Sequence, residues 1–566
     1  MRRFFRILFI IIVVLFFIII FLGVWFQLDT RVSIPEPSDR SVTKLPVVIP
    51  EKGFYTCGSG WLQKRNSSLW ELYLEGKPFE RGVIEGKLTR VLIEKQEQAF
   101  TNQITQIIPS PLYLKFLRYF IYWFNRDLED YIPEEYKFEI YGISLSASDK
   151  FSFIGNNYQR ILNYHSAHDI GHALQDFQLV GCTSFGVWKD KSKDGSLLIG
   201  RNFDFYVGDD FDLNKIVCFE KPEKGYPFMM ITWGGMTGAV SGMNEQGLTV
   251  TINAAKSDIP YSARTPISIL AREILQYAKN IKEAYAIAQK RETFVSESIL
   301  IGSANDGQAS IIEKSPYKIA LVEPQDNYIV STNHFRSVVF SNDPKNLKDM
   351  KENASLYRYK KMLQDITEEQ PLDVEGMAKI LRDQSGLNHV DIGMGNEKAV
   401  NQLIAHHSII FEPEKHLVWV SDGPWQIGGY TCYDIFKVFH NFAGLHRKTE
   451  ISETGRAISP DRFLNSDGYV KFNRFRELRK ELKDMIRSGK ETNLQRSYIN
   501  ELIGTNPEFF QVYSLTGDYF FLKNEPDSAA RYYRIALGKE IPRQNEKQKI
   551  IKKLADCLVQ MKTKKS

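Results

Sequence analysis

The stretch Gly181-Cys182-Thr183-Ser184-Phe185-Gly186, with Gly200-Arg201-Asn202-Phe203-Asp204 behind it, decides how this chain is interpreted. A β-type run follows Cys182 as far as the turn Lys193-Asp194-Gly195, and a second β-type run leads from that turn to Gly200. Two runs joined in this way predict a hairpin, which returns the chain to where it started. The second stretch is therefore expected to lie beside the first.

The expected hairpin gives Cys182 chemical surroundings that Cys218 and Cys432 lack. The guanidinium of Arg201 would favour the thiolate, which is the reactive form of cysteine, and the carboxylate of Asp204 would be placed to orient an amine. Without such neighbours, a cysteine at the start of a strand is usually a buried structural thiol. We therefore take Cys182 as the candidate nucleophile.

Length and composition indicate a globular chain of several structural units. The 566 residues exceed one ordinary core. A hydrophobic content of 43% with 13% aromatic residues argues against disorder. The net charge is only +5, and Lys and Arg are spread among Asp and Glu instead of forming a basic stripe. Nucleic acid is therefore not expected as a partner.

The N-terminus predicts a single-pass membrane anchor over residues 1–27. Residues Ile7–Phe26 carry no charge and would span about 30 Å of hydrocarbon as a helix. Arginines precede them, so the N-terminus is expected in the cytoplasm and the rest of the chain outside. A cleaved signal peptide is the alternative, but its apolar region is usually shorter, about 7–15 residues, and ends in small residues. Residues 28–50 contain several prolines and predict an extended stalk.

Three further regions differ in the secondary structure that their sequence pattern predicts. Residues 51–181 read as a mainly helical pro-segment or α-chain, in which the aromatic run Tyr113–Tyr122 is expected to be core. Residues 182–444 contain short β-type runs and two helical segments, which predict an α+β fold of layered sheets covered by helices. Residues 445–566 are charged and helical, with a spacing near 513–542 that resembles one tetratricopeptide repeat. One repeat cannot bury its own face, so we expect it to pack on the domain.

Four motifs together resemble those of a known superfamily. They are Cys182-Thr183-Ser184, Gly200–Asp204, Gly242–Leu248 and Asn253. This set resembles the N-terminal-nucleophile hydrolases of the C45 acyltransferase and choloylglycine hydrolase type, a superfamily that includes penicillin V acylase and acid ceramidase. The resemblance covers about Glu75 to Tyr433 and implies a four-layer αββα sandwich. The 181 residues before the cysteine favour the C45-like branch, because simple bile-salt hydrolases begin at the nucleophile.

The resemblance also implies roles for individual residues. Cys182 would be the nucleophile, and its α-amine, freed by self-cleavage of the Gly181–Cys182 bond, would be the general base. Arg201 would lie against the thiolate, and Asp204 would hold the amine. The family's oxyanion-hole asparagine, second asparagine and late positioning arginine correspond to Asn253, Asn333 and Arg358. No cofactor or metal is implied.

The function expected from these residues is amide hydrolysis or acyl transfer on a non-peptide N-acyl amide, which a membrane-tethered enzyme could draw from lipid-like molecules. Two other classes remain open at this stage. One is an inactive scaffold that binds a protein partner through its helical C-terminal region. The other is a cysteine peptidase, which would need a histidine hydrogen-bonded to Cys182.

Histidines near the expected cleavage point raise a separate alternative. His165, His168 and His172 are spaced to share one helix face, with Asp169 among them, and such a cluster is able to hold a metal. The cluster lacks the HExxH order, so we expect packing or hydrogen-bonding roles instead. His406 and His407 open an expected strand and are interpreted as structural or pocket-lining.

Overall fold

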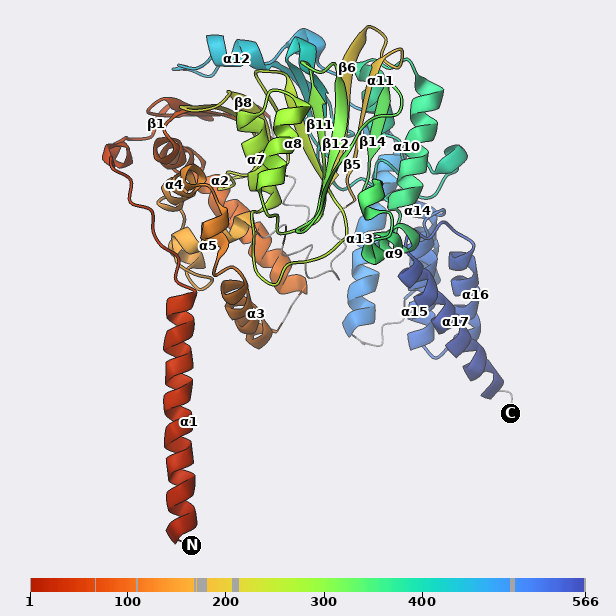
Figure 1. Cartoon of the computed structure of the whole chain (residues 1–566). Coiled ribbons are helices and arrows are strands. Elements are labelled where there is room, and N and C mark those ends of the chain that lie inside the picture. The colour runs from red at the N-terminus through yellow and green to blue at the C-terminus, as the bar shows by residue number, and fades with distance from the viewer. Residues whose placement is uncertain are drawn as a thin grey trace.

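The computed structural model shows a layered domain from which one long helix projects, with a helical region at the C-terminus (Figure 1). The structure describes residues 2–66, 68–107, 110–166, 169, 181–205, 213–488 and 494–563. His168 and His172 lie outside the described residues.

The described strands form two sheets. The eleven-stranded sheet has the order β1-β2-β3-β4-β7-β8-β9-β10-β11-β12-β13, and the six-stranded sheet has the order β14-β5-β6-β15-β16-β17. In the first sheet the strands are β1 Val48–Glu51, β2 Phe54–Cys57, β3 Gly60–Lys64, β4 Leu69–Gly76, β7 Lys215–Pro222, β8 Phe228–Thr232, β9 Ser241–Asn244, β10 Leu248–Ala254, β11 Glu297–Ser303, β12 Gln308–Lys314 and β13 Ile319–Val322. In the second they are β14 Tyr328–Ser331, β5 Thr183–Lys189, β6 Gly195–Asp204, β15 Ala405–Glu412, β16 Leu417–Ser421 and β17 Tyr430–Asp434.

The helices fall into three groups along the chain. Before Cys182 come α1 Arg2–Asp29, α2 Pro78–Ile107, α3 Pro111–Phe124, α4 Glu134–Ser144 and α5 Asn157–His165. Within the sheet region lie α7 Ile267–Tyr277, α8 Ile281–Lys290, α9 Pro344–Glu352, α10 Ser355–Glu369, α11 Val374–Leu381 and α12 Ile435–Asn441. The C-terminal helices are α13 Asp467–Ser488, α14 Arg496–Thr505, α15 Phe510–Leu522, α16 Pro526–Leu537 and α17 Gln544–Thr563.

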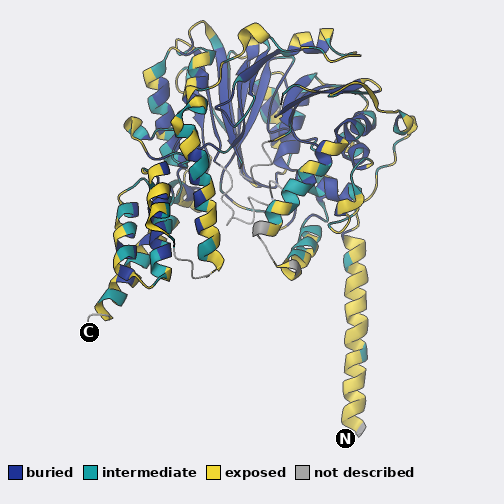
Figure 2. Cartoon of the chain, turned by 180° about the vertical axis from the view of Figure 1, so that it is seen from behind, coloured by how far each residue is buried: buried dark blue, intermediate teal, exposed yellow. Residues whose placement is uncertain are grey.

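Three apolar cores define four layers. The core between the two sheets takes Leu197 and Ile199 of β6, together with side chains of β3, β4, β7 and β8. Leu198, between them, points to the other face, where it packs with α10 and α11. Helices α2, α4, α7 and α8 cover the outer face of the larger sheet. Because strand side chains alternate between faces, the order is helix, sheet, sheet, helix, and Figure 2 shows the buried strands at its centre.

The strands and helices expected between Thr183 and Val420 are confirmed, but the expectation of a mainly helical segment 51–181 is wrong in its first part. Residues 54–76 form β2, β3 and β4, and β4 pairs in parallel with β7. Residues Leu69–Leu74 are buried on both faces, and a short apolar run of this kind has no period that separates a strand from a helix. The chain before Cys182 is thus built into the same sheet as the chain after it.

Residues 28–50, which were expected to form an extended stalk, lie partly against the domain. Helix α1 runs to Asp29, and the residues that follow lie on the domain. Thr30 and Val42 are buried. The carbonyl of Thr30 accepts a hydrogen bond from Gln159 Nε2 at 3.1 Å, and Lys87 Nζ donates to the carbonyl of Thr43 at 2.7 Å. Helix α1 is therefore joined closely to the domain.

The C-terminal helices pack on the domain, as expected, although they begin only at Asp467 rather than at 445. Their core includes Leu403, Ala405, Trp425 and Ile427 of the sheet domain. Helices α15 and α16 form an adjacent pair in which a Cβ on Gly517 would lie 2.6 Å from the Tyr533 ring. The resemblance of this pair to a tetratricopeptide repeat stays a prediction.

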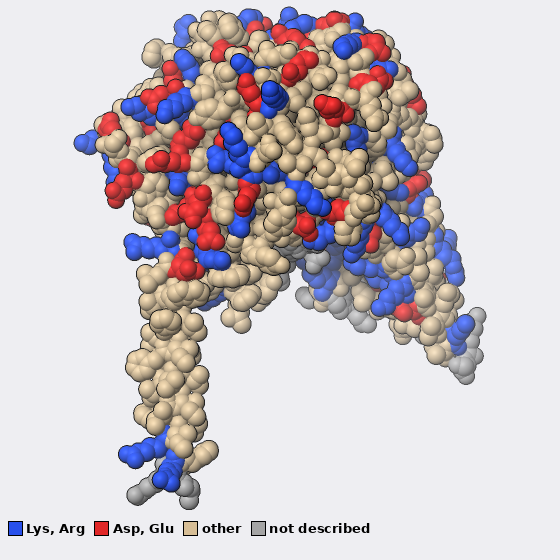
Figure 3. All heavy atoms as spheres, in the orientation of Figure 1, with Lys and Arg blue, Asp and Glu red and all other residues tan. Residues whose placement is uncertain are grey.

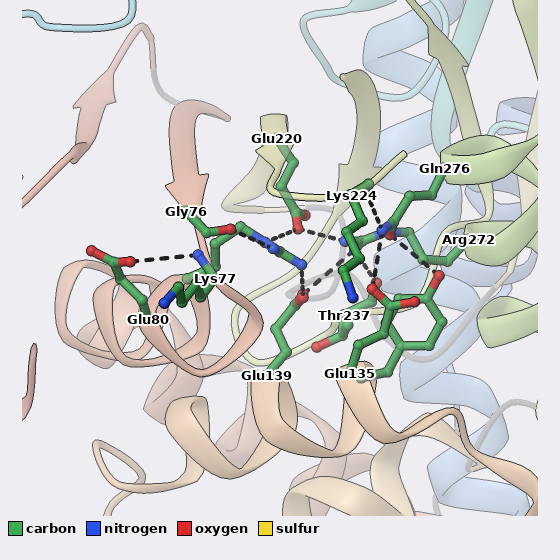
Figure 4. Close-up of polar contacts among 12 residues, drawn as sticks. Gly76, Lys77, Glu80, Glu135, Glu139, Glu220, Lys224, Thr237, Arg272 and Gln276 are labelled. Atoms are coloured by element: carbon green, nitrogen blue, oxygen red, sulfur yellow. Dashed lines mark hydrogen bonds and ion pairs between the residues drawn. The ribbon is translucent and has the colours of Figure 1, made fainter. Parts of the chain in front are cut away.

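A buried cluster of four charges joins the parts of the chain on either side of Cys182 (Figure 4). Arg81 of α2 contacts Glu139 of α4 and Glu220 of β7, each at 2.6 Å. Arg272 of α7 contacts the same two glutamates, with Nη1 3.5 Å from Glu139 and Nη2 bonded to Glu220. All four side chains are at most 1% exposed, so each charge depends on its partners for compensation.

We expect Glu220→Gln to lower the free energy of unfolding by about 3–5 kcal/mol, because it leaves the buried cluster with excess positive charge. The matched control is Glu292→Gln, since Glu292 pairs with Arg264 at 3.0 Å but is 65% exposed. That change should cost less than about 1 kcal/mol. Urea unfolding of the full chain in detergent, followed by tryptophan fluorescence, measures both. Equal midpoints for the two variants would show that the cluster is not a stabilising element.

Candidate active site

The expected hairpin brings the three central residues together. Cys182 directly precedes β5, and β5 pairs with β6 in antiparallel register, with Thr183 opposite Asn202 and Ser184 opposite Arg201. Both Arg201 and Asp204 are fully buried, as is Cys182. The guanidinium Nη2 of Arg201 lies 3.7 Å from Cys182 Sγ.

The guanidinium of Arg201 is held by backbone acceptors of the larger sheet. Nη1 donates to the carbonyl of Val240 at 2.9 Å and Nη2 to the carbonyl of Ile252 at 2.5 Å. The group lies 4.2 Å from the centre of the Phe203 ring. These contacts fix the cation against the sulfur. Among the residues that the structure describes, its neighbours are backbone carbonyls, a hydroxyl and an aromatic face.

Burial has a stronger effect on the Cys182 thiol than the neighbouring cation. Desolvation raises the pKa of Cys182 to about 11, even though Arg201 lowers it. The thiol of the intact chain is therefore protonated at neutral pH, and a nucleophilic attack requires a group that accepts its proton.

Asp204 has the properties of such a group. Desolvation raises the pKa of its carboxyl to about 7, while Arg358 and Arg201 lower it. A carboxylate whose pKa lies near neutral pH is an effective proton acceptor. The backbone carbonyl of Asp204 also accepts a hydrogen bond from the Gly181 N–H at 2.8 Å, which ties the residue before Cys182 to β6.

Gln402 is a site residue that the sequence analysis missed. Its Nε2 donates to the carbonyl oxygen of Gly181 at 2.8 Å and to Asp204 Oδ2 at 3.2 Å. A Cβ on Gly181 would lie only 2.6 Å from this nitrogen. Gln402 comes from the connection before β15 and has no motif around it, so only the folded structure reveals that it contacts the carbonyl adjoining Cys182.

Asn253, Asn333 and Arg358 form a second chain of contacts next to Arg201. Asn253 follows Ile252, whose carbonyl binds Arg201, and its Nδ2 donates to the Ser331 carbonyl at 3.0 Å. Asn333 Nδ2 donates to the carbonyl of Ala254 at 3.1 Å, and Arg358 Nη2 donates to Asn333 Oδ1. The structure thus links all three, while their catalytic roles stay predictions.

Glu297 is a second residue that sequence reasoning missed. It begins β11, opposite Ala254 of β10. Burial raises its pKa well above the usual range, and the buried Asp169 adds to this effect. Its charge also acts to raise the pKa of Cys182. An acidic residue that starts a strand carries no sequence signal of this proximity.

The histidines do not form a Cys–His pair in the described residues. His407 Nε2 is hydrogen-bonded to Ser241 Oγ at 2.8 Å, and Ser241 Oγ in turn accepts a hydrogen bond from Arg201. Burial and the neighbouring Arg201 lower the pKa of His407 well below its usual value. Of the atoms that the structure places, Arg201 Nη2 is the hydrogen-bond partner of the Cys182 sulfur. The peptidase interpretation therefore has no support in the part of the chain that is described.

The structure describes His165 of the histidine cluster, and its contacts match the expected hydrogen-bonding role. Its Nδ1 is bonded to the Ile161 carbonyl at 2.9 Å, and its Nε2 accepts the Thr237 N–H at 2.9 Å. Both ring nitrogens are thus engaged by the backbone. Elsewhere in the described residues, Asp365, Asp383 and His389 have ligand atoms close to one another, but Lys361 Nζ bonds both carboxylates and supplies the positive charge.

Residues 188–423 match the model of the family described as acyl-coenzyme A:6-aminopenicillanic acid acyl-transferase. The predicted resemblance to the C45-type acyltransferases is confirmed. The matched acyltransferase segment contains Arg201, Asp204, Asn253, Asn333 and Arg358, while Cys182 lies just before it. The segment includes the last two residues of β5 and the whole of β6, β10 and helix α10.

Individual relatives are distant. An uncharacterized protein of Archaeoglobus fulgidus is 22% identical over 316 residues, which are 49% of this chain and 52% of that protein. The chain thus spans about half the length of this curated relative.

Two solved structures are also similar to part of this chain. An N-acylethanolamine-hydrolyzing acid amidase ortholog of Caenorhabditis elegans is 16% identical, covers 41% of this chain and 93% of its own, and has a TM-score of 0.31. A mutant of the conjugated bile acid hydrolase of Clostridium perfringens is 12% identical, covers 45% and 93%, and has a TM-score of 0.29. At these TM-scores neither likeness carries the argument for fold or function.

Proposed function

We propose that this chain is a membrane-anchored amidohydrolase or acyltransferase that acts on N-acyl amides after it has cleaved its own Gly181–Cys182 bond. The observation that carries the proposal is the arrangement at that bond. A thiol, a fixed cation and a carboxyl with a pKa near neutral meet at a peptide carbonyl that already accepts a side-chain hydrogen bond. The family match over residues 188–423 supports the same class of chemistry.

Self-cleavage would begin with attack of Cys182 Sγ on the carbonyl carbon of Gly181. Asp204 accepts the thiol proton, and the carbonyl oxygen becomes an oxyanion that Gln402 Nε2 stabilises by its hydrogen bond. The carbon–nitrogen bond then breaks, the nitrogen takes the proton, and Gly181 is left as a thioester on the sulfur. Water hydrolyses this thioester, which gives a carboxylate on Gly181 and a free thiol and free amine on Cys182.

The freed α-amine would serve as general base in catalysis. Its reference pKa of about 7.7–8.0 suits proton transfer at neutral pH. Asp204 and Gln402, which are hydrogen-bonded to each other beside Cys182, would hold it, and Arg201 would stabilise the thiolate. The thiolate attacks the substrate's amide carbonyl, Asn253 donates to the oxyanion, and the acyl group then passes to water or to an acceptor amine.

The membrane helix supports lipid-like N-acyl amides as substrates. Helix α1 is long and apolar enough to cross a bilayer, with a mean hydropathy of 3.7 over its most apolar part, and that part is not buried in the domain. Its arginines lie at the N-terminal end, so the positive-inside rule places the catalytic domain outside the cytoplasm. A panel of N-acyl amides that differ in chain length and head group, assayed with and without acceptor amines, tests this assignment.

We expect purified active protein to contain a chain that starts at Cys182, and Cys182→Ala to abolish both the cleavage and the amidase activity. Cys182→Ser should retain slow cleavage, because the hydroxyl is a weaker nucleophile at its usual pKa. Intact-mass spectrometry measures the products. Active wild-type protein with an unbroken chain would contradict the proposal.

The rate of self-cleavage should fall as the pH drops through 7. The pKa of Asp204 is raised to about 7 in the intact chain, so its carboxylate is lost below that pH. Cleavage should be roughly tenfold slower at pH 6 than at pH 8, following the ionised fraction of one such group. The measurement is the decay of full-length protein on gels after cell-free synthesis and a shift of pH. A rate that is flat over this range, or that rises toward pH 6, rules out Asp204 as the proton acceptor.

Gln402→Leu should slow self-cleavage by roughly 10²-fold, as the loss of an oxyanion donor does in other acyl-transfer sites. The control is Gln276→Leu, because Gln276 is equally buried but lies in α7, where it bonds Glu135 and Lys224. The folded fraction of that variant should cleave at the wild-type rate. The same gel assay applies to both, and equal rates would show that the Gln402 contact has no part in the cleavage.

A further inference from the structure

Helix α3 presents an exposed apolar face. Leu112 is 80% exposed, Phe116 64%, Tyr119 49% and Trp123 39%. Their spacing of four, three and four residues places them on one side of the helix. The run Tyr113–Tyr122 was expected to be core, and that expectation is wrong for Phe116 and Tyr119. We call these four residues the apolar face of α3.

Other residues of α3 fix the helix to the domain. The apolar face is therefore exposed even though the helix is docked. The Phe124 ring packs against the buried Phe294, with centroids 5.2 Å apart. The Phe124 carbonyl accepts the Ala263 N–H at 3.0 Å, and the Tyr122 hydroxyl donates to the carbonyl of Ile154. The helix also begins in a defined way, because Ser110 caps it and Pro111 occupies its first turn.

Helix α3 lies beside the domain end of the anchor helix, as both Figure 1 and Figure 2 show. The Phe26 ring of α1 contacts the Tyr119 ring, with centroids 5.8 Å apart. At the ends of the two helices, Arg126 Nε lies 3.8 Å from Asp29 Oδ2. The medium that surrounds the end of α1 therefore also meets the apolar face of α3.

Charge and aromatic content around α3 match the interfacial zone of a bilayer. The helix contains Lys115 and Arg118 but no acidic residue. The Arg118 guanidinium lies 4.7 Å from the Tyr119 ring centre, and the Arg126 guanidinium lies 4.9 Å from that of Trp123. Aromatic side chains beside basic ones are typical of helices at the headgroup level. Figure 3 shows the uncharged surface of α1 continuing onto the adjoining part of the domain.

We propose that α3 lies in the interfacial layer of the same bilayer that α1 spans, with its apolar face in contact with lipid. This inference rests on the membrane anchoring in the proposed function. Because the residues after α1 lie on the domain and are hydrogen-bonded to it, α1 and α3 together hold the domain at one orientation on the membrane. Burying the apolar face in lipid removes from water a surface that would otherwise be left exposed.

The test is a fluorescent probe on the full chain in vesicles of phosphatidylcholine and phosphatidylglycerol. The labelled variants are made in the Cys182→Ala background, which removes the reactive thiol of the proposed site. Phe116→Cys then takes an environment-sensitive NBD dye selectively, because the other four native cysteines are buried. The matched control is Phe436→Cys, since Phe436 is 48% exposed on α12, at the end of the domain far from α1 (Figure 1). We expect a blue shift at position 116 and a loss of its fluorescence when lipids with shallow nitroxide labels are present, with neither effect at position 436.

Three results would overturn the inference. Water-like emission at position 116, unchanged by the nitroxide lipids, shows that α3 stays in solvent. Blue-shifted emission without quenching shows that another protein surface covers the face. Carbonate extraction and N-terminal sequencing report on the anchor separately. Loss of α1 from the mature chain, with no binding to vesicles, removes the anchoring itself, whereas a retained α1 with a solvent-exposed position 116 removes only the role of α3.

Discussion

The parallel pairing of β4 with β7 is the constraint on which the rest of the structure depends. It runs along the whole of β4, from Leu69 beside Lys215 to Gly76 beside Pro222. A parallel pair needs a long crossover connection, and here that connection contains helices α2, α3, α4 and α5 and the hairpin β5–β6. Side chains of β4 enter the cores on both faces of the sheet. A break before Cys182 would thus cut the connection between β4 and β7 but leave the pairing of these two strands intact.

The hairpin at Cys182 could be predicted because its signal is local. Two β-type runs separated by a turn near Lys193–Gly195 predict a hairpin, and the observed pairing of β5 with β6 places Arg201 beside the sulfur. The contact of Gln402 with Gly181 could not be predicted, since it joins residues 221 positions apart and depends on the path of the chain before β15. Strands β2–β4 were missed for a different reason, because apolar side chains on both faces hide the period of a strand.

Helix α3 shows a further limit of sequence patterns. Periodicity reports which residues share a face, but it does not report whether protein, lipid or water covers that face. In α3 both sides are apolar: Phe124 faces the domain, and Phe116 faces away from it. The exposed side is recognised because the structure shows which side of α3 is docked on the domain. The position of α3 beside α1 is the observation that indicates lipid as the medium around the exposed side.

Burial around Cys182 connects the two stages of the proposed chemistry. In the intact chain, desolvation keeps the Cys182 thiol protonated and raises the pKa of Asp204 to about 7. The thiol is therefore neutral and the Asp204 carboxyl is partly ionised when both face the Gly181–Cys182 bond. Cleavage would place an amine beside Asp204. A cationic amine within a few ångströms favours the carboxylate, so the same residue changes from proton acceptor to counter-ion. The change in charge between cleavage and catalysis would therefore come from the new amine and from Asp204, with no further titrating group required.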